Sequence, residues 1–175
     1  MVKITRDEIV YSSPYWKIHE VDLESNGRKV TDQCIEHPNS ALIVPITEEG
    51  NVVMVKEFCA ALNRCELFLP KGAIDAGEDP ETGAQRELQE EAGLKAGKLD
   101  FLGKLTVHPA HIGIETFAFL ARDLSENRLN TGNEVEELEV IHHPFEKFEE
   151  LIESGQLTEA RAIAALFLTR KFLKK

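Results

Sequence analysis

Hydrophobic and polar residues in the first forty positions follow a pattern that predicts a β-hairpin. Residues 16–23 and residues 28–36 form the two strand candidates. Between them stands Ser25-Asn26-Gly27, and Asn-Gly is a preferred two-residue turn between antiparallel strands. We therefore expect these two segments to pair.

Two short apolar runs follow, at residues 41–46 and residues 52–55, separated by turn-forming residues 48–51. Runs this short and this apolar are typical of buried strands. Further strand candidates come later in the chain, at residues 99–107, 114–121 and 138–141.

The remaining pattern predicts three helices. Asp79 is an N-cap followed by Pro80, and this helix runs to about Ala92 and ends at Gly93. One side of it is small or apolar, suited to packing on a sheet, through Ala84, Leu88 and Ala92.

A second helix opens at Pro144 and stops at Gly155, with Phe145, Phe148, Leu151 and Ile152 on one side. Thr158 is the expected cap of a third helix, whose core-facing residues are Ala160, Ile163, Ala164 and Phe167. Mixed strands with an early helix and a helical C-terminus predict an α/β sandwich.

Composition narrows the class of protein. The chain has 175 residues, of which 42% are hydrophobic, so one domain with a sizeable core is expected, with a small accessory segment at either end as the alternative, and no linker marks a boundary. No apolar run approaches the ~18 residues of a membrane helix, and the N-terminus lacks a signal core. Three cysteines, an odd number without a Cys-x-x-Cys pair, favour a reducing compartment, and we expect a cytoplasmic protein.

The formal net charge is −11, from 31 acidic and 20 basic residues. Such a surface repels nucleic-acid backbones and anionic membranes, so neither is an expected partner. If an acidic protein of this kind acts on an anionic substrate, it needs cations to mediate the contact between protein and substrate.

The chemistry concentrates on the helix that begins at Pro80. At about 100° per residue, Glu87 and Glu91 lie about 40° apart on one face, with Glu90 on the flank. We expect this face to be exposed. Arg86 reaches Glu90 one turn on, but it cannot neutralise all these carboxylates and Glu78 as well. A hard divalent cation with oxygen ligands, Mg²⁺ with Mn²⁺ as the alternative, offsets the repulsion.

The loop before the helix contains Gly72 and Gly77. Glycine permits positive φ and lets the backbone approach a phosphate closely. Loop, acidic helix and metal together predict a diphosphate site.

Nine positions of this region, Gly72, Glu78, Arg86, Glu87, Leu88, Glu90, Glu91, Gly93 and Leu94, match in type and spacing the sequence motif of the Nudix hydrolases, the Nudix box. The chain resembles that family. The resemblance implies an α/β/α Nudix sandwich with a mixed β-sheet over residues 41–175 and an N-terminal antiparallel strand segment over residues 1–40. It also implies hydrolysis of a nucleoside diphosphate linked to another moiety.

The resemblance assigns roles to the box residues. Glu87 and Glu91 look like the principal metal ligands, and Glu90 and Glu78 look like additional ones, with Glu90 also counted as catalytic. Arg86 resembles the orienting arginine of the family. Bound Mg²⁺ would neutralise the diphosphate and acidify a water molecule.

A further carboxylate orients or deprotonates the water. In the ADP-ribose branch of the family it comes from a downstream acidic loop, which residues 130–137 resemble. Glu134 and Glu136 are the two candidates, and Glu134 is the preferred one. A solvated acidic turn is the alternative reading of this loop.

Segments outside the box resemble the ADP-ribose pyrophosphatase and ADP-compounds hydrolase group, including residues 55–58, 66–72, 159–161 and 165–168. Pro109 lies close to where that group carries a proline that marks ADP-ribose preference. The resemblance therefore implies conversion of ADP-ribose to AMP and ribose 5-phosphate. The candidate substrate-binding residues are Gly72, Arg86, Lys56, Glu66 and Pro109.

Several alternatives stay open. Dinucleoside polyphosphates, NADH and nucleotide sugars are possible substrates of the same family, and a nucleotide-sensing module without turnover is the alternative of another class. Relatives are typically homodimers whose N-terminal strands complete the nucleotide pocket, and residues 1–40 carry a strand pattern suited to that role.

Overall fold

The computed structural model describes residues 1–129 and 138–174. The chain divides into two compact units. One comprises Met1–Asn39 and Thr106–Glu115, and the other comprises Ser40–Leu105 and Thr116–Lys175. No helix in the described part of the chain is long and apolar enough to cross a membrane.

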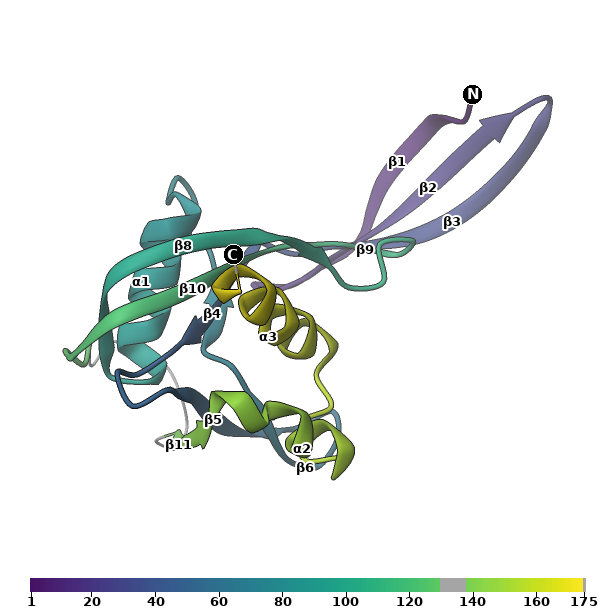
Figure 1. Cartoon of the computed structure of the whole chain (residues 1–175). Coiled ribbons are helices and arrows are strands. Elements are labelled where there is room, and N and C mark those ends of the chain that lie inside the picture. The colour runs from purple at the N-terminus through teal and green to yellow at the C-terminus, as the bar shows by residue number, and fades with distance from the viewer. Residues whose placement is uncertain (130–137, 175) are drawn as a thin grey trace. The chain divides into compact units, whose positions relative to one another are not determined.

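The first unit is a four-stranded sheet with the order β1-β2-β3-β9 (Figure 1). The strands are β1 (Lys3–Ser12), β2 (Lys17–Ser25), β3 (Arg28–Glu36) and β9 (Ile112–Gly113). The first three are antiparallel, so the predicted antiparallel character of the N-terminal segment is confirmed. The predicted hairpin is also confirmed, because Asn26 and Gly27 both have positive φ (51° and 73°), as a two-residue turn of this kind requires.

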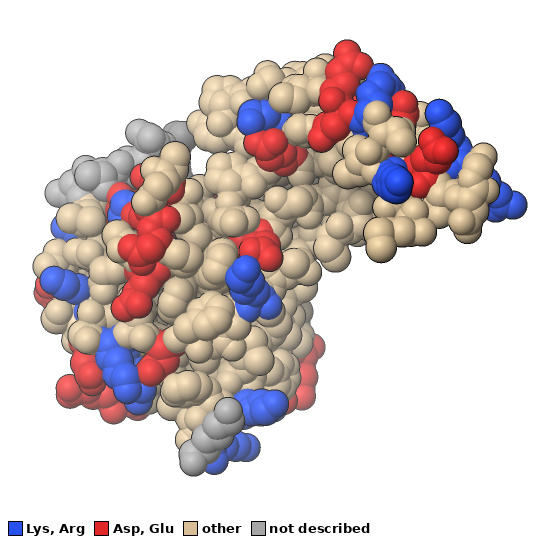
Figure 2. Space-filling model, turned by 90° about the horizontal axis from the view of Figure 1, so that it is seen from above, with Lys and Arg blue, Asp and Glu red and all other residues tan. Residues whose placement is uncertain are grey.

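All ten residues of β1 are exposed, and the sequence pattern did not define this strand. A strand without a covered face is under no pressure to alternate apolar and polar side chains. Charged side chains of β1 instead pair with β2, as in the contact of 2.9 Å between Arg6 and Asp22. Acidic and basic side chains lie next to one another at several places on the face seen in Figure 2, which also shows a band of acidic side chains on its left.

The second unit contains two sheets. A four-stranded sheet has the order β7-β4-β10-β8, and a three-stranded sheet has the order β11-β5-β6. β10 is parallel to β4 and β7 is antiparallel to it, so the predicted mixed sheet is confirmed. The strands are β4 (Ser40–Pro45), β5 (Asn51–Cys59), β6 (Arg64–Phe68), β7 (Lys71–Ala73), β8 (Leu94–Thr106), β10 (Glu115–Glu126) and β11 (Glu139–Pro144).

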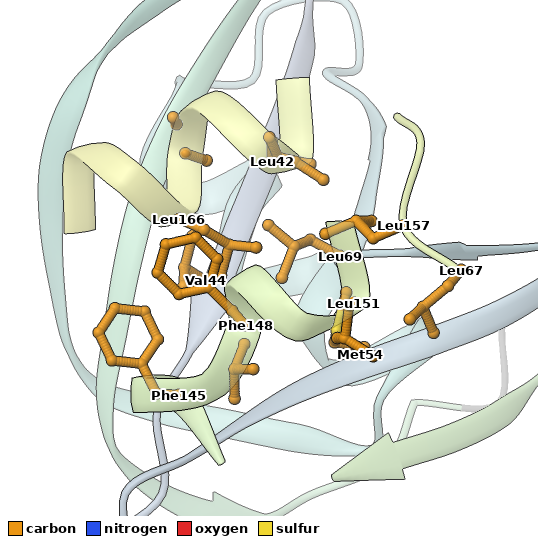
Figure 3. Close-up of a cluster of buried hydrophobic side chains, with 14 residues drawn as sticks. Leu42, Val44, Met54, Leu67, Leu69, Phe145, Phe148, Leu151, Leu157 and Leu166 are labelled. Carbon is orange, nitrogen blue, oxygen red and sulfur yellow. The ribbon is translucent and has the colours of Figure 1, made fainter. Parts of the chain in front are cut away.

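β4 separates two hydrophobic cores. Ala41 and Ile43 belong to the core under α1 (Pro80–Glu91), together with Leu88. Leu42 and Val44 belong to the opposite core, which the C-terminal helices cover. Figure 3 shows that second core, where Phe148 and Leu166 point toward β4. Because successive residues of a strand face opposite ways, a strand covered on both sides must be apolar throughout. The predicted α/β/α sandwich is confirmed.

The predicted strand segments match the structure with shifted ends. Residues 41–45 lie in β4 and residues 52–55 lie in β5, and the two strands belong to different sheets. Ile46, directly after β4, forms an isolated bridge with Val52. β8 begins at Leu94, directly after the helix, and β10 continues to Glu126, so both are longer than predicted.

α1 has the predicted boundaries. The Asp79 carboxylate accepts hydrogen bonds from the backbone N–H groups of Glu81 and Thr82, both at 3.1 Å. Pro80 is the first helical residue, and Gly93 follows the helix with φ at 70°.

The second predicted helix is a 3₁₀ turn, η1 (Phe145–Lys147), followed by α2 (Phe148–Glu153). Pro144 is the last residue of β11, so the chain leaves the strand through the tighter turn before the α-helix begins. The predicted apolar side is buried through Phe145, Phe148 and Leu151.

Two predictions for α3 (Ala160–Leu173) are wrong. The cap is Glu159, whose carboxylate accepts a hydrogen bond of 2.7 Å from the N–H of Ala162, and not Thr158. The buried face consists of Ala162, Ala165, Leu166 and Thr169, while Ala160 and Phe167 are exposed. The sequence of this helix is apolar almost all round, so several stripes have helical spacing and only packing selects one.

Candidate active site

Two buried carboxylates of α1 meet the short strand β7. Glu87 and Glu91 are 8% and 7% exposed. The Glu91 carboxylate accepts a hydrogen bond of 2.9 Å from the backbone N–H of Lys71. The Glu87 carboxylate lies against Gly72, where an added β-carbon would be 2.1 Å from its carbon. The expected exposed acidic face is therefore wrong, because this face packs on β7.

Arg86 joins three of the four motif carboxylates. Its Nη1 donates to Glu87 at 2.6 Å and to Glu90 at 3.0 Å. Its Nε and Nη2 donate to the two oxygens of Glu78 at 3.1 and 2.9 Å. Nη2 also donates to the carbonyl of Ala73 at 2.8 Å, which uses the five N–H donors of a guanidinium. Sequence reasoning expected only the contact with Glu90.

Burial and this network move the pKa values in opposite directions. The hydrogen bond from Arg86 holds the pKa of Glu78 below its usual range. Burial raises the pKa of Glu87, although Arg86 opposes the shift. Burial raises the pKa of Glu91 to about 8, because the charge of Lys71 and its N–H offset only part of the desolvation. Within the described residues, Arg86 forms no hydrogen bond or ion pair with Glu91.

Lys71 and Glu57 were not identified from the sequence. The Lys71 ammonium is 3.1 Å from the Glu57 carboxylate and lies 4.1 Å from the centre of the Phe68 ring. Glu57 comes from β5, fourteen positions before Lys71, so the three-stranded sheet brings it to the site. The signal available in the sequence was only the position of Lys71 directly before Gly72.

These residues fit a divalent cation by donor type. Glu87 and Glu91 place carboxylate oxygens one helical turn apart, next to the adjacent residues Lys71 and Gly72. Hard cations such as Mg²⁺ and Mn²⁺ prefer such oxygens, and a cation offsets the cost of burying two carboxylates. In the part of the chain that the structure describes, no group of three or more His, Cys, Asp or Glu side chains is arranged to hold a metal ion. The guanidinium of Arg86 is bonded to Glu87 instead.

Comparison with known proteins identifies the family. The model of the NUDIX domain matches residues 36–166, which is well over half of the chain. The chain belongs to the Nudix family. It is similar to ADP compounds hydrolase NudE of Escherichia coli (strain K12), with 35% identity over 95% of this chain and 90% of the relative. It is also similar to ADP-ribose pyrophosphatase of Bacillus subtilis (strain 168), with 30% identity over 94% of this chain and 90% of the relative.

A solved structure, described as the crystal structure of ADP compounds hydrolase, has the same fold. Its TM-score to this chain is 0.90 at 34% identity, and the match covers 99% of this chain and 94% of the other. The predictions of the Nudix fold and of a Nudix hydrolase are confirmed.

The two glycines before the Nudix helix have different roles. Gly77 has φ at 84°, as sequence reasoning expected. Gly72 is not among the described residues with positive φ, and its lack of a side chain instead makes room for Glu87. Of the two, only Gly77 uses the positive φ that glycine permits.

Glu66 is buried at 8% exposure, and its partners are side chains of the protein. Arg64 Nε contacts one carboxylate oxygen, and the Thr158 hydroxyl donates to the other at 3.1 Å. Glu66 therefore ties β6 to the segment before α3.

The other candidates lie at separate places. Lys56, on β5, pairs with Glu139 of β11 at 3.2 Å. Pro109 is an exposed turn residue of the N-terminal unit. Glu134 and Glu136 fall in residues 130–137, outside the described residues.

Proposed function

We propose that this Nudix hydrolase binds Mg²⁺, with Mn²⁺ as an alternative, and hydrolyses the diphosphate of ADP compounds. ADP-ribose is the leading substrate, with AMP and ribose 5-phosphate as products. The observation that carries the proposal is that Glu87 and Glu91 contact β7, at Gly72 and at the N–H of Lys71. Two carboxylates are buried here beside a glycine whose position has no room for a side chain. A helix that only packs on a sheet does not need buried carboxylates.

The residues of the chain have distinct tasks in the proposed mechanism. Glu87 and Glu91 would hold the cation, with Glu90 and Glu78 as additional ligands. When bound, the cation neutralises diphosphate charge and lowers the pKa of water. Arg86 orients Glu78, Glu87 and Glu90 through its hydrogen bonds, and so fixes the ligand directions before substrate arrives.

We propose Glu134 as the residue that orients or deprotonates the attacking water, with Glu136 and Glu90 as the other candidates. Glu134→Gln should depress turnover with little change in metal affinity. Glu136→Gln is the matched variant of the same loop. An unaffected rate in Glu134→Gln moves the base to Glu136 or Glu90.

ADP-ribose is preferred because two relatives matched over 90% of their length carry names that specify ADP compounds and ADP-ribose. Substrate contacts are proposed for Gly72, Arg86, Lys56, Glu66 and Pro109. The carboxylate of Glu66 already binds Arg64 and Thr158, so its role in this set differs from that of a carboxylate free to bind substrate.

For residues 1–40 we propose a role in homodimer formation and in the nucleotide pocket, beside a Nudix domain at residues 41–175. Support comes from apolar side chains of the first unit that are exposed in the single chain, namely Ile4, Ile9, Val10, Tyr11 and Val30. Light scattering of the purified protein should give twice the chain mass of 19.7 kDa. A monomer over the whole concentration range contradicts the dimer.

The cytoplasmic location remains a prediction that rests on the cysteine pattern.

The deciding experiment is a substrate panel with Mg²⁺. ADP-ribose, NADH, diadenosine triphosphate and GDP-mannose are compared by kcat/KM, with product analysis by chromatography. The proposal expects ADP-ribose to be the best substrate and EDTA to abolish turnover. Preference for another member of the panel selects one of the alternative substrates, and binding without turnover of any member selects the nucleotide-sensing module.

A further inference from the structure

Lys71 brings a positive charge to the carboxylate site from inside the protein. Its backbone N–H binds Glu91, and its ammonium binds Glu57. The side chain is 19% exposed, so much of the ammonium's surroundings is protein and its field on the neighbouring carboxylates is only partly screened by water.

The ammonium is held in place from several directions. β7 pairs with the fully buried β4, where Lys71 stands opposite Leu42. The Phe68 ring lies 4.1 Å from the ammonium, and Glu57 accepts from it at 3.1 Å. A cation fixed by an aromatic ring and a carboxylate stays near the site whether or not a metal is present.

Glu57 is the carboxylate to which the Lys71 ammonium is hydrogen-bonded. Glu87 and Glu91 also attract Lys71, since its charge lowers the pKa of both against the effect of burial. The hydrogen bond with Glu57 draws the ammonium toward β5. A divalent cation held by Glu87 and Glu91 is repelled by the ammonium, and this repulsion depends on where Glu57 keeps it.

We propose that Lys71 is a positioning residue that limits the affinity of the Nudix carboxylates for divalent cations, and that Glu57 sets the strength of this competition. The inference rests on the proposed function, because it assumes that Glu87 and Glu91 are the metal ligands. Lys71 holds Glu91 through its backbone N–H, and its ammonium, paired with Glu57, weakens the binding of a cation at Glu87 and Glu91.

The test is a titration of the substrate-free protein with Mn²⁺, followed by electron paramagnetic resonance of the free ion. Lys71→Met should bind Mn²⁺ about tenfold more tightly, because a nearby positive charge is gone. Lys71→Arg keeps the charge and should stay within about twofold of the wild type. Glu57→Gln should bind more weakly, because it removes a negative charge near the site and leaves the charge of the Lys71 ammonium unpaired by Glu57.

Lys98→Met is the matched control. Lys98 also pairs with a carboxylate, Asp100 on the same strand β8, at 3.5 Å, and the variant changes the net charge by the same amount. Its Mn²⁺ affinity should equal that of the wild type. Thermal melting of each variant establishes that it is folded.

Tighter Mn²⁺ binding in folded Lys71→Met, together with wild-type binding in Lys71→Arg, distinguishes charge repulsion from a structural role of the side chain. Folded Lys71→Met with unchanged or weaker Mn²⁺ affinity overturns the inference. If Lys71→Met does not fold, a Glu57→Gln variant that binds as tightly as the wild type overturns it instead. A wild-type protein that binds no Mn²⁺ overturns the proposed function, which separates the two failures.

Discussion

Gly72 and Glu87 fit so closely that a β-carbon on residue 72 would lie 2.1 Å from the carboxylate carbon of Glu87. The contact joins the strand β7 to the helix α1, fifteen positions apart in the chain. It explains in steric terms why the first position of the Nudix box is occupied by glycine here.

Gly72→Ala should therefore lower turnover strongly without unfolding the protein. The methyl group displaces the end of a flexible side chain and not the backbone, so the loss of stability should stay below about 1 kcal/mol. A displaced ligand of about 1 Å costs on the order of a hundredfold in turnover. Urea unfolding and kcat measure the two effects.

Gly113→Ala is the control for this substitution, since a β-carbon there meets only the Ile35 carbonyl, at an ordinary 3.5 Å. It should leave both stability and turnover unchanged. Wild-type turnover in Gly72→Ala contradicts the assigned role of Glu87.

Glu91→Gln should bind no catalytic metal while keeping the fold, because the amide has the size of the carboxyl and its oxygen still accepts from Lys71 N–H. Turnover should fall by at least about a hundredfold, since even groups that only orient a metal ligand contribute 10–100-fold. Mg²⁺ at about 100 times its Kd should stabilise the wild type by ~2.7 kcal/mol and leave the variant unaffected. Melting curves with and without EDTA make the comparison. An equal Mg²⁺ shift in both proteins contradicts the ligand assignment.

Arg86→Lys should impair the site although it keeps the charge. The guanidinium makes five hydrogen bonds to Glu78, Glu87, Glu90 and Ala73, whereas an ammonium has three donors. Turnover should fall about 10–100-fold, in the range of groups that orient metal ligands. Steady-state kinetics at saturating Mg²⁺ measures the loss. Arg170→Lys, which changes a surface pair with Glu149, should retain wild-type kinetics.

His19 should titrate above its usual range in the N-terminal unit. The hydrogen bond with Asp7, at 2.7 Å, is the main cause of the raised pKa, burial opposes it, and Glu36 adds to it at 3.0 Å. Protonated His19 thus stabilises the folded state below pH 6.5, the pKa expected for the unfolded chain, and this contribution is lost as pH rises through the higher folded pKa. An NMR titration of the histidine ring measures the folded pKa directly. Asp7→Asn should lower it, and a wild-type pKa at or below 6.5 contradicts the assignment.

The sequence alone determined the features that depend on neighbouring residues. The caps of α1 at Asp79 and Gly93 and the turn at Asn26-Gly27 were predicted correctly, because each depends on hydrogen bonds or φ values within a few residues. The spacing of Glu87, Glu90 and Glu91 likewise follows from helical periodicity.

Only the tertiary structure decided what those carboxylates face. Packing of α1 on β7 buries Glu87 and Glu91, and the pairing of β5 and β7 with other strands brings Glu57 to Lys71. The predicted buried face of α3 and its predicted cap, Thr158, were wrong for the same reason, since the cap is Glu159. Burial, and the pKa shifts and charge pairing that follow from it, depend on contacts between segments distant in the chain, which local periodicity does not contain.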